Sequence, residues 1–173
     1  MKQSTKIGKT VPMDFARSKY FDALSLFVIT VLGIAIYSNS FTCSFHFDDL
    51  VHIVNNEKIR DLSDIRSWWS HSPNRPLPVF TLALNYHFHE LDVWYWHLFN
   101  LIFHLINACL VYWLCLLLFS TPYLKVQKFS PYKRYIALFT ALLFLSHPLA
   151  TQSVTYIIQR MTSMVALFYF LSL

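Results

Sequence analysis

The feature that most constrains this chain is the segment from Trp94 to Phe119, which contains no charged residue. At about 1.5 Å of rise per residue, a helix of this length crosses the roughly 30 Å hydrocarbon core of a bilayer. The rest of the chain agrees with a lipid environment, because only 13% of its 173 residues are charged and 55% are hydrophobic. Soluble domains carry about 25% charged residues. We therefore predict an all-α fold, a polytopic membrane helix bundle.

Further apolar stretches extend this prediction along the chain. We expect spans at 21–41, 94–119 and 135–146, followed at 147–173 by an outer-edge segment and the start of a fourth span. That last apolar stretch is too short to cross a bilayer. The sequence thus predicts an incomplete bundle that belongs to a larger protein or assembly. A cleaved signal peptide is the alternative for the first stretch, but its membrane-spanning length favours a retained anchor.

The distribution of charge predicts the orientation. The segments 1–20 and 120–134 are basic, whereas the loop 42–93 holds seven acidic and four basic residues. Basic loops stay in the cytoplasm. We therefore expect an integral membrane protein with a cytoplasmic N-terminus, a cytoplasmic loop at 120–134, and a periplasmic or lumenal loop at 42–93.

Two helices are expected within the outer loop. The segment 61–71 begins with Asp61, a residue type that caps helices, and its apolar side chains recur on one helical face. The segment 77–91 has a similar apolar face but is interrupted by His87 and His89. Both segments suit helices that lie in the headgroup layer, above the membrane spans.

An acidic pair, Asp48 and Asp49, follows the first span between apolar neighbours. Adjacent carboxylates at a low-dielectric boundary raise the pKa of at least one of them, which suits a proton acceptor. The pair is therefore our candidate catalytic site, with solvated loop aspartates as the alternative. A divalent cation held by Asp48, Asp49 and His52 is a further alternative, and no other cofactor is indicated.

The second span carries a polar stripe, since His97, Asn100, His104 and Asn107 recur at helical spacing. Polar side chains at this depth face protein or a wet cavity. Hydrogen bonds between helices explain the deeper residues His104 and Asn107. For His97, near the outer mouth, a substrate-binding role is equally open.

Arg75 and Arg160 are candidate phosphate ligands, because both are expected at the outer face and a guanidinium binds phosphate through paired hydrogen bonds. Arg75 stands between a turn and Pro76, so its backbone is held. For Arg160, extension of the side chain toward lipid headgroups is the alternative.

Several of these residues together form a pattern. The ordered motifs resemble the front part of C-type glycosyltransferases, in particular the transmembrane and tetratricopeptide-repeat-containing O-mannosyltransferases and their bacterial relatives. The motifs are Phe47-Asp48-Asp49, Asn74-Arg75-Pro76-Leu77, Trp96-His97-Leu98-Phe99-Asn100 with His104, His147-Pro148 and Gln152-Ser153-Val154.

This resemblance implies that a sugar is transferred from a polyprenyl phosphate to a protein or glycan on the extracytoplasmic face. Asp48 would be the catalytic base and Asp49 its partner, which orients the acceptor or a cation. Arg75 or Arg160 would contact the lipid phosphate. The chain departs from the family in having three full spans, part of a fourth and no 34-residue repeat. We therefore expect a module that is inactive alone and is completed by further segments or another membrane chain.

The rival interpretation is a small, non-catalytic membrane subunit that packs within a larger complex. It explains the short chain and its aromatic surface, and it predicts that changes at Asp48 and Asp49 are tolerated. The partners expected under either interpretation are membrane lipid and another membrane chain, with no nucleic acid.

Overall fold

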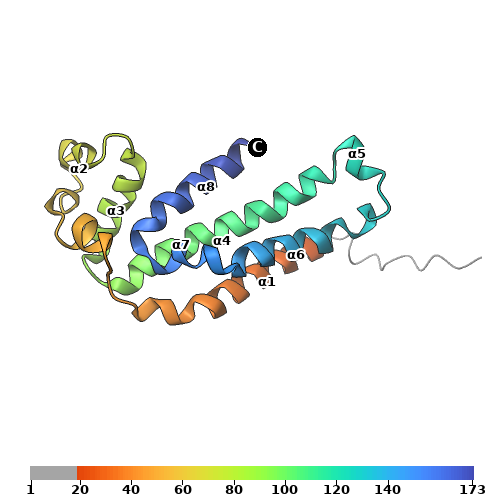
Figure 1. Ribbon diagram of the computed structural model, residues 1–173, viewed down its shortest axis with the longest axis horizontal. Helices are drawn as coiled ribbons and strands as arrows, with labels where there is room; N and C mark the ends of the chain where they lie inside the picture. The colour runs from red at the N-terminus through yellow and green to blue at the C-terminus, as the bar shows by residue number, and fades with distance from the viewer. Residues whose placement is uncertain (1–18) are drawn as a thin grey trace, which may run out of the picture.

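A computed structural model describes residues 19–173, and every regular element in this range is helical (Figure 1). The predicted all-α membrane bundle is confirmed. The basic segment expected at 1–20 lies outside the described residues except for its last two. The α-helices are α1 (Lys19–Tyr37), α2 (Ile65–His71), α3 (Pro76–His89), α4 (Val93–Leu118), α5 (Pro122–Lys125), α6 (Lys133–Ser146), α7 (Gln152–Thr155) and α8 (Arg160–Ser172). Shorter turns are η2 (Ser38–Thr42), η3 (Leu50–Val54), η4 (Glu57–Ile59), η5 (Ser130–Tyr132), η6 (Pro148–Ala150) and η7 (Ile157–Gln159).

The helix α4 is the centre of the bundle and packs against α1, α6 and α8 (Figure 1). Small residues permit close approach, since Ala137 and Ala141 of α6 are fully buried in this contact. At Gly33 of α1, an added Cβ would lie 2.5 Å from Leu105 Cδ2 of α4. Membrane helices associate largely through such tight van der Waals contacts, because lipid supplies no hydrophobic driving force between them.

Two helical stretches, Lys19–Thr42 and Val93–Leu118, are long and apolar enough to cross a membrane. A third candidate is bent by 55° between Ser130–Ser146 and Pro148–Thr155. The bend falls at Pro148, which lacks a backbone donor and whose ring clashes with the preceding helical turn. The helix α8 is apolar but shorter than a span.

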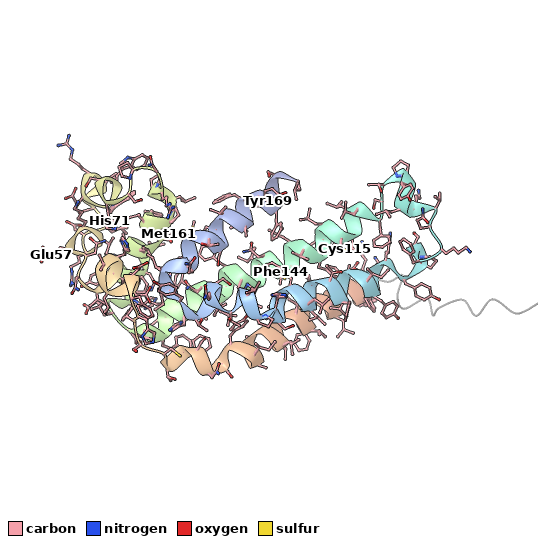
Figure 2. The ribbon with its side chains drawn as sticks, viewed as in Figure 1. Glu57, His71, Cys115, Phe144, Met161 and Tyr169 are labelled. Carbon is pink, nitrogen blue, oxygen red and sulfur yellow. The ribbon has the colours of Figure 1, made fainter. Side chains whose placement is uncertain are left out.

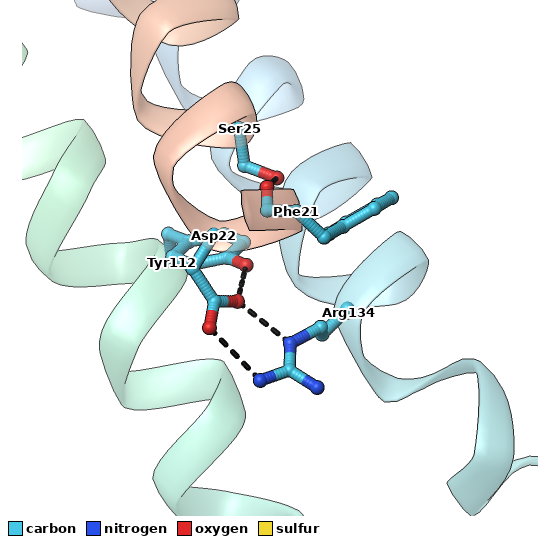
Figure 3. Close-up of polar contacts among 5 residues, drawn as sticks. All are labelled: Phe21, Asp22, Ser25, Tyr112 and Arg134. Atoms are coloured by element: carbon cyan, nitrogen blue, oxygen red, sulfur yellow. Dashed lines mark hydrogen bonds and ion pairs between the residues drawn. The ribbon is translucent and has the colours of Figure 1, made fainter. Parts of the chain in front are cut away.

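A polar cluster joins three helices near the end of the bundle that carries α5 (Figure 3). Arg134 of α6 forms an ion pair with Asp22 of α1, with Nε–Oδ1 and Nη2–Oδ2 distances of 2.7 and 2.9 Å. The Tyr112 hydroxyl of α4 donates to Asp22 Oδ1 at 2.6 Å. The cluster satisfies a carboxylate that would be costly to leave unpaired beside lipid.

The polar stripe of α4 is buried and forms hydrogen bonds with other elements. Asn100 Nδ2 donates to the Ile157 carbonyl at 3.1 Å, and Asn107 Nδ2 donates to that of Ser163 at 2.9 Å. His104 Nε2 lies 3.1 Å from the Leu145 carbonyl. The predicted role of the deeper stripe residues in holding helices together is confirmed.

The opposite end of the bundle carries α2 and α3, together with the turns η3 and η4 (Figure 1). Its apolar core joins the loop 42–93 to the beginning of α4 and to the segment before α8. The fully buried members of this core are Ile53, Ile59, Val79, Leu82, Ala83, Trp96 and Ile157. That α2 and α3 lie in the headgroup layer stays a prediction.

The start of α2 differs from the expectation. Asp61 was the predicted capping residue, and this is wrong because its Oδ1 accepts hydrogen bonds from the backbone and hydroxyl of Ser63. The cap is Asp64, whose Oδ1 accepts the Ser67 N–H at 3.0 Å. Two aspartates three residues apart offer alternative caps, and the Asp61 carboxylate is used in its own turn.

Candidate functional site

The acidic pair lies in a turn between α1 and η3. Phe47, immediately before the pair, has a φ of 46°, in the left-handed region that non-glycine residues rarely adopt. Two backbone hydrogen bonds close the turn, from Asp49 N–H to the His46 carbonyl at 2.9 Å and from Leu50 N–H to that of Phe47 at 3.1 Å. The two carboxylates have different surroundings, since Asp48 is exposed and Asp49 is buried.

Asp49 anchors the turn to the segment that precedes α8. Its Oδ1 accepts the Ile158 N–H at 2.8 Å, and its Oδ2 accepts the His46 N–H at 3.2 Å. Burial raises the pKa of Asp49, although these backbone hydrogen bonds act in the opposite direction. At least one raised pKa was predicted for the pair, and burial is its main cause. With 1% of its surface exposed, Asp49 fixes the turn that presents Asp48.

Asp48 lines a cavity of about 280 Å³. The other side chains around it include His52, His71 and Arg75 from the outer loop and Gln159 and Thr162 from the segment that begins α8. Figure 2 locates His71 and Met161, another lining residue, at this end of the molecule. Residues that are distant in sequence therefore line one cavity. They include the candidate base Asp48 and the positively charged Arg75.

Tyr156 holds Asp48 in place, and no sequence motif had indicated it. The backbone N–H of Asp48 donates to the Tyr156 hydroxyl at 3.2 Å. Burial raises the pKa of Tyr156, the hydrogen bond from the Asp48 backbone N–H lowers it, and the negative charge of Asp48 raises it. Tyr156 lies two residues before Ile158, which donates to Asp49. The segment 156–158 therefore holds both Asp48 and Asp49.

A histidine pair forms one wall of the cavity. His52 Nδ1 lies 3.1 Å from His71 Nε2, so a proton on one ring can be shared with the other. Burial lowers the pKa of His71, and the neighbouring His52 lowers it further. Two protonated rings would repel each other at this distance, so the contact needs at least one neutral ring.

We predict that α2, which carries His71 at one wall of the cavity, becomes less stable at acidic pH. A histidine whose pKa is lower in the folded state than its unfolded value of about 6.5 contributes stability above that pH, and this contribution is lost as the pH falls through the folded pKa. The protection of the α2 amides from hydrogen exchange, taken relative to the intrinsic exchange rate at each pH, is therefore expected to fall between pH 7 and pH 5. A His71→Gln variant should reduce this dependence. Protection factors that are the same at both pH values would contradict the assignment.

Arg75 lies where the polar cavity meets an apolar groove. The groove has a volume of about 510 Å³ and is lined by Leu77, Val165 and Phe168, among others. Arg75, Met161 and Thr162 line both spaces. The exposed guanidinium of Arg75 contacts Met161 Sδ at 3.8 Å. The positive charge of Arg75 therefore lies at one end of the apolar groove.

Arg160 lies elsewhere and is fully buried. Its Nε donates to Asn100 Oδ1 and its Nη2 to Asn85 Oδ1, both at 2.8 Å. Its Nη1 donates to the Thr81 carbonyl at 3.1 Å, and the guanidinium stacks over the Trp96 ring at 5.4 Å. The structure therefore gives Arg160 a role in joining α3, α4 and α8, and does not place it among the residues that line the cavity.

His97 also lies outside the cavity. It is buried in α4, with Nδ1 3.1 Å from the Val154 carbonyl and Nε2 3.0 Å from the Cys43 carbonyl. These contacts tie the beginning of the outer loop to α7. Neither His97 nor Arg160 is among the residues that line the cavity of Asp48.

The structure does not bring together the three residues considered for a divalent cation. Asp49 binds backbone amides, and His52 contacts His71, whereas Asp48 faces the cavity. Within residues 19–173, no group of three or more metal-ligating side chains has suitable geometry.

Comparison with known proteins identifies relatives over most of the chain. It is 31% identical over 155 residues to the protein O-mannosyl-transferase TMTC3 of Mus musculus and 33% identical over 150 residues to TMTC1 of Homo sapiens. These matches cover 82% and 79% of this chain but only 15% and 16% of the relatives' lengths. No family model and no solved structure matches. The chain is therefore homologous, over most of its own length, to part of the TMTC protein O-mannosyl-transferases, which confirms the resemblance that its motifs indicated.

Proposed function

We propose that this chain is a module of a membrane glycosyltransferase. In this proposal, a sugar passes from a polyprenyl-phosphate donor to a hydroxyl group of a protein acceptor on the extracytoplasmic face. The observation that carries the proposal is the single cavity shared by Asp48 and Arg75, which continues into an apolar groove. The relatives' names add mannose as the sugar and oxygen as the acceptor atom. Because the chain spans about one sixth of those relatives, the activity is proposed for an assembly that contains it.

Asp48 and Arg75 take opposite parts in the reaction. The carboxylate of Asp48 accepts the proton of the acceptor hydroxyl, whose oxygen then forms a bond to the anomeric carbon of the sugar. The bond from that carbon to the phosphate oxygen breaks, and its electron pair leaves with the polyprenyl phosphate. Arg75 stabilises the negative charge that develops on this leaving group.

The apolar groove accommodates the other part of the donor. Leu77 of α3 and Val165 and Phe168 of α8 supply an apolar wall directly beside Arg75. An isoprenoid chain that extends from a phosphate at Arg75 would remain covered along this wall, as expected for a ligand that is charged at one end. A non-catalytic subunit would need neither this groove nor a carboxylate and a guanidinium in one cavity.

The proposal is tested by Arg75→Gln in the complete membrane assembly. Loss of a charge-assisted contact with the leaving phosphate is expected to lower kcat/KM for the lipid-linked donor by about 10- to 100-fold. Transfer from radiolabelled polyprenyl-phosphate mannose to a protein acceptor measures this directly. Arg66→Gln is the matched control, because Arg66 is exposed on α2 and does not line the cavity. Equal rates for Arg75→Gln and the unchanged protein would remove Arg75 from the mechanism.

A further inference from the structure

A second cavity lies at the end of the bundle that carries α5, opposite the cavity of Asp48 (Figure 1). Its volume is about 650 Å³. The lining comes from the end of α4, the segment 120–132 and the first turn of α6. The proposed glycosyl transfer does not use this cavity.

The cavity concentrates positive charge. Lys125, Lys133 and Arg134 line it, together with polar side chains such as Ser120 and Gln127. Arg134 is paired with Asp22, but the segment 120–134 contains no acidic residue. Within residues 19–173, no carboxylate forms an ion pair with either lysine.

The first turn of α6 adds to the positive charge around the cavity. Lys133 is in this turn, which contains no acidic residue. The first turn of a helix carries a partial positive charge and normally favours negative side chains. The Asp22 carboxylate offsets part of this positive charge, because it pairs with Arg134 and also interacts electrostatically with Lys133. The cavity beside Lys133 has room for a further anion.

A smaller space with one apolar side adjoins the charged cavity. A second space of about 220 Å³ shares Ser120, Lys133 and Arg134 with it. The rest of its lining is Asp22 of α1, whose carboxylate is paired with Arg134, and Trp113, Leu116 and Leu117 of α4. Trp113 and Leu117 are exposed on the surface that would face lipid. Cations at one end and an apolar strip at the other suit a ligand that has an anionic head and a hydrocarbon chain.

We propose that these adjoining cavities bind an anionic phospholipid of the surrounding bilayer. Its phosphate lies beside Lys125 and Lys133, and one acyl chain follows Trp113 and Leu117. A free phosphate ion would use only the charged cavity and would leave the apolar strip uncovered. Basic pockets at the ends of membrane helices are suited to the headgroups of acidic lipids.

Trp113 provides the readout. The chain has five tryptophans, and the other four (Trp68, Trp69, Trp94 and Trp96) belong to the outer loop or to the beginning of α4. The full chain is reconstituted into vesicles of phosphatidylcholine and phosphatidylglycerol in equal amounts, with brominated acyl chains on only one of the two lipids. Bromine quenches tryptophan fluorescence on contact, and subtraction of the Trp113→Phe signal isolates Trp113. Brominated phosphatidylglycerol is expected to quench Trp113 about fivefold more effectively than brominated phosphatidylcholine.

Lysine variants test whether the lipid preference depends on the residues that line this cavity or on the positive charge of the whole segment. Lys125→Gln with Lys133→Gln is expected to bring the ratio of quenching by the two lipids close to one. Lys128→Gln is the control, because Lys128 belongs to the same segment but does not line the cavity. Lys125 is exposed, so the single Lys125→Gln variant should keep the fold and lower the ratio at least twofold.

Three results would overturn the proposal. One is equal quenching of Trp113 by the two brominated lipids in the unchanged protein. Another is a Lys128→Gln variant that lowers the ratio as much as Lys125→Gln does. The third is loss of the preference on adding inorganic phosphate, measured against chloride at equal ionic strength, which would assign the cavity to a free anion.

Discussion

Replacement of Asp48 by Asn is expected to abolish sugar transfer while membrane insertion and folding are retained. An amide cannot accept the acceptor proton, and the loss of a general base lowers a rate by about 100- to 10,000-fold. The fold should survive because the Asp48 side chain is exposed, and because asparagine keeps the backbone N–H that donates to Tyr156 and a side-chain oxygen that can accept from its hydroxyl. The measurement is transfer of labelled mannose by the membrane assembly, with amounts of inserted protein matched by immunodetection.

A nearby acid provides the control for this prediction. Glu57 belongs to the same loop and is exposed, but it does not line the cavity. Glu57→Gln therefore removes a carboxylate without touching the proposed base, and its rate should stay within about twofold of the unchanged protein. Full activity in Asp48→Asn would exclude Asp48 as the base. The role that the sequence resemblance implies for Asp48 would then be wrong.

Arg160→Met is expected to destabilise the end of the bundle that carries α2 and α3 by about 3 kcal/mol or more. Methionine fills a similar volume but removes the donors that satisfy Asn85 and Asn100, whose buried oxygens then lack these partners. Thermal unfolding in detergent measures the effect. A lysine at the same position keeps one charge but cannot reach both amides in the planar geometry of a guanidinium, so Arg160→Lys should be intermediate.

A surface arginine tests whether this effect depends on burial. Arg75→Met removes the same functional group from an exposed position, and its unfolding temperature should change little although transfer falls. If Arg160→Met unfolded at the temperature of the unchanged protein and instead raised KM for the lipid donor, Arg160 would be a phosphate ligand after all. We therefore expect Arg160→Met to lower mainly the stability of the bundle and Arg75→Met to weaken mainly the interaction with the donor.

The fold was largely predictable because its strongest signals are local. The uncharged run at Trp94 to Phe119 corresponds to α4, and the polar stripe within it correctly indicated hydrogen bonds between helices. The bend at Pro148 likewise follows from the chemistry of one residue. The cap of α2 was misassigned because Asp61 and Asp64 are both plausible from sequence, and the choice depends on a side-chain hydrogen bond to Ser63.

The site was less predictable, since it depends on contacts between distant segments. Residue chemistry and position relative to the spans identified Asp48 and Arg75 as candidates but could not show that they line one cavity. They could not separate Arg75 from Arg160 either, because both stand near the expected outer face and only tertiary packing buries the second. Tyr156 was missed for the same reason: its partner is 108 residues earlier in the chain.

The hydrogen bond from Ile158 to Asp49 has a consequence for biosynthesis. It joins residues 109 positions apart, so the turn that presents Asp48 lacks its anchor while only the earlier part of the chain has left the ribosome. The first two hydrophobic helices can enter the translocon and reach the bilayer before that bond exists. Assembly of the proposed site is therefore a late event during synthesis of the chain.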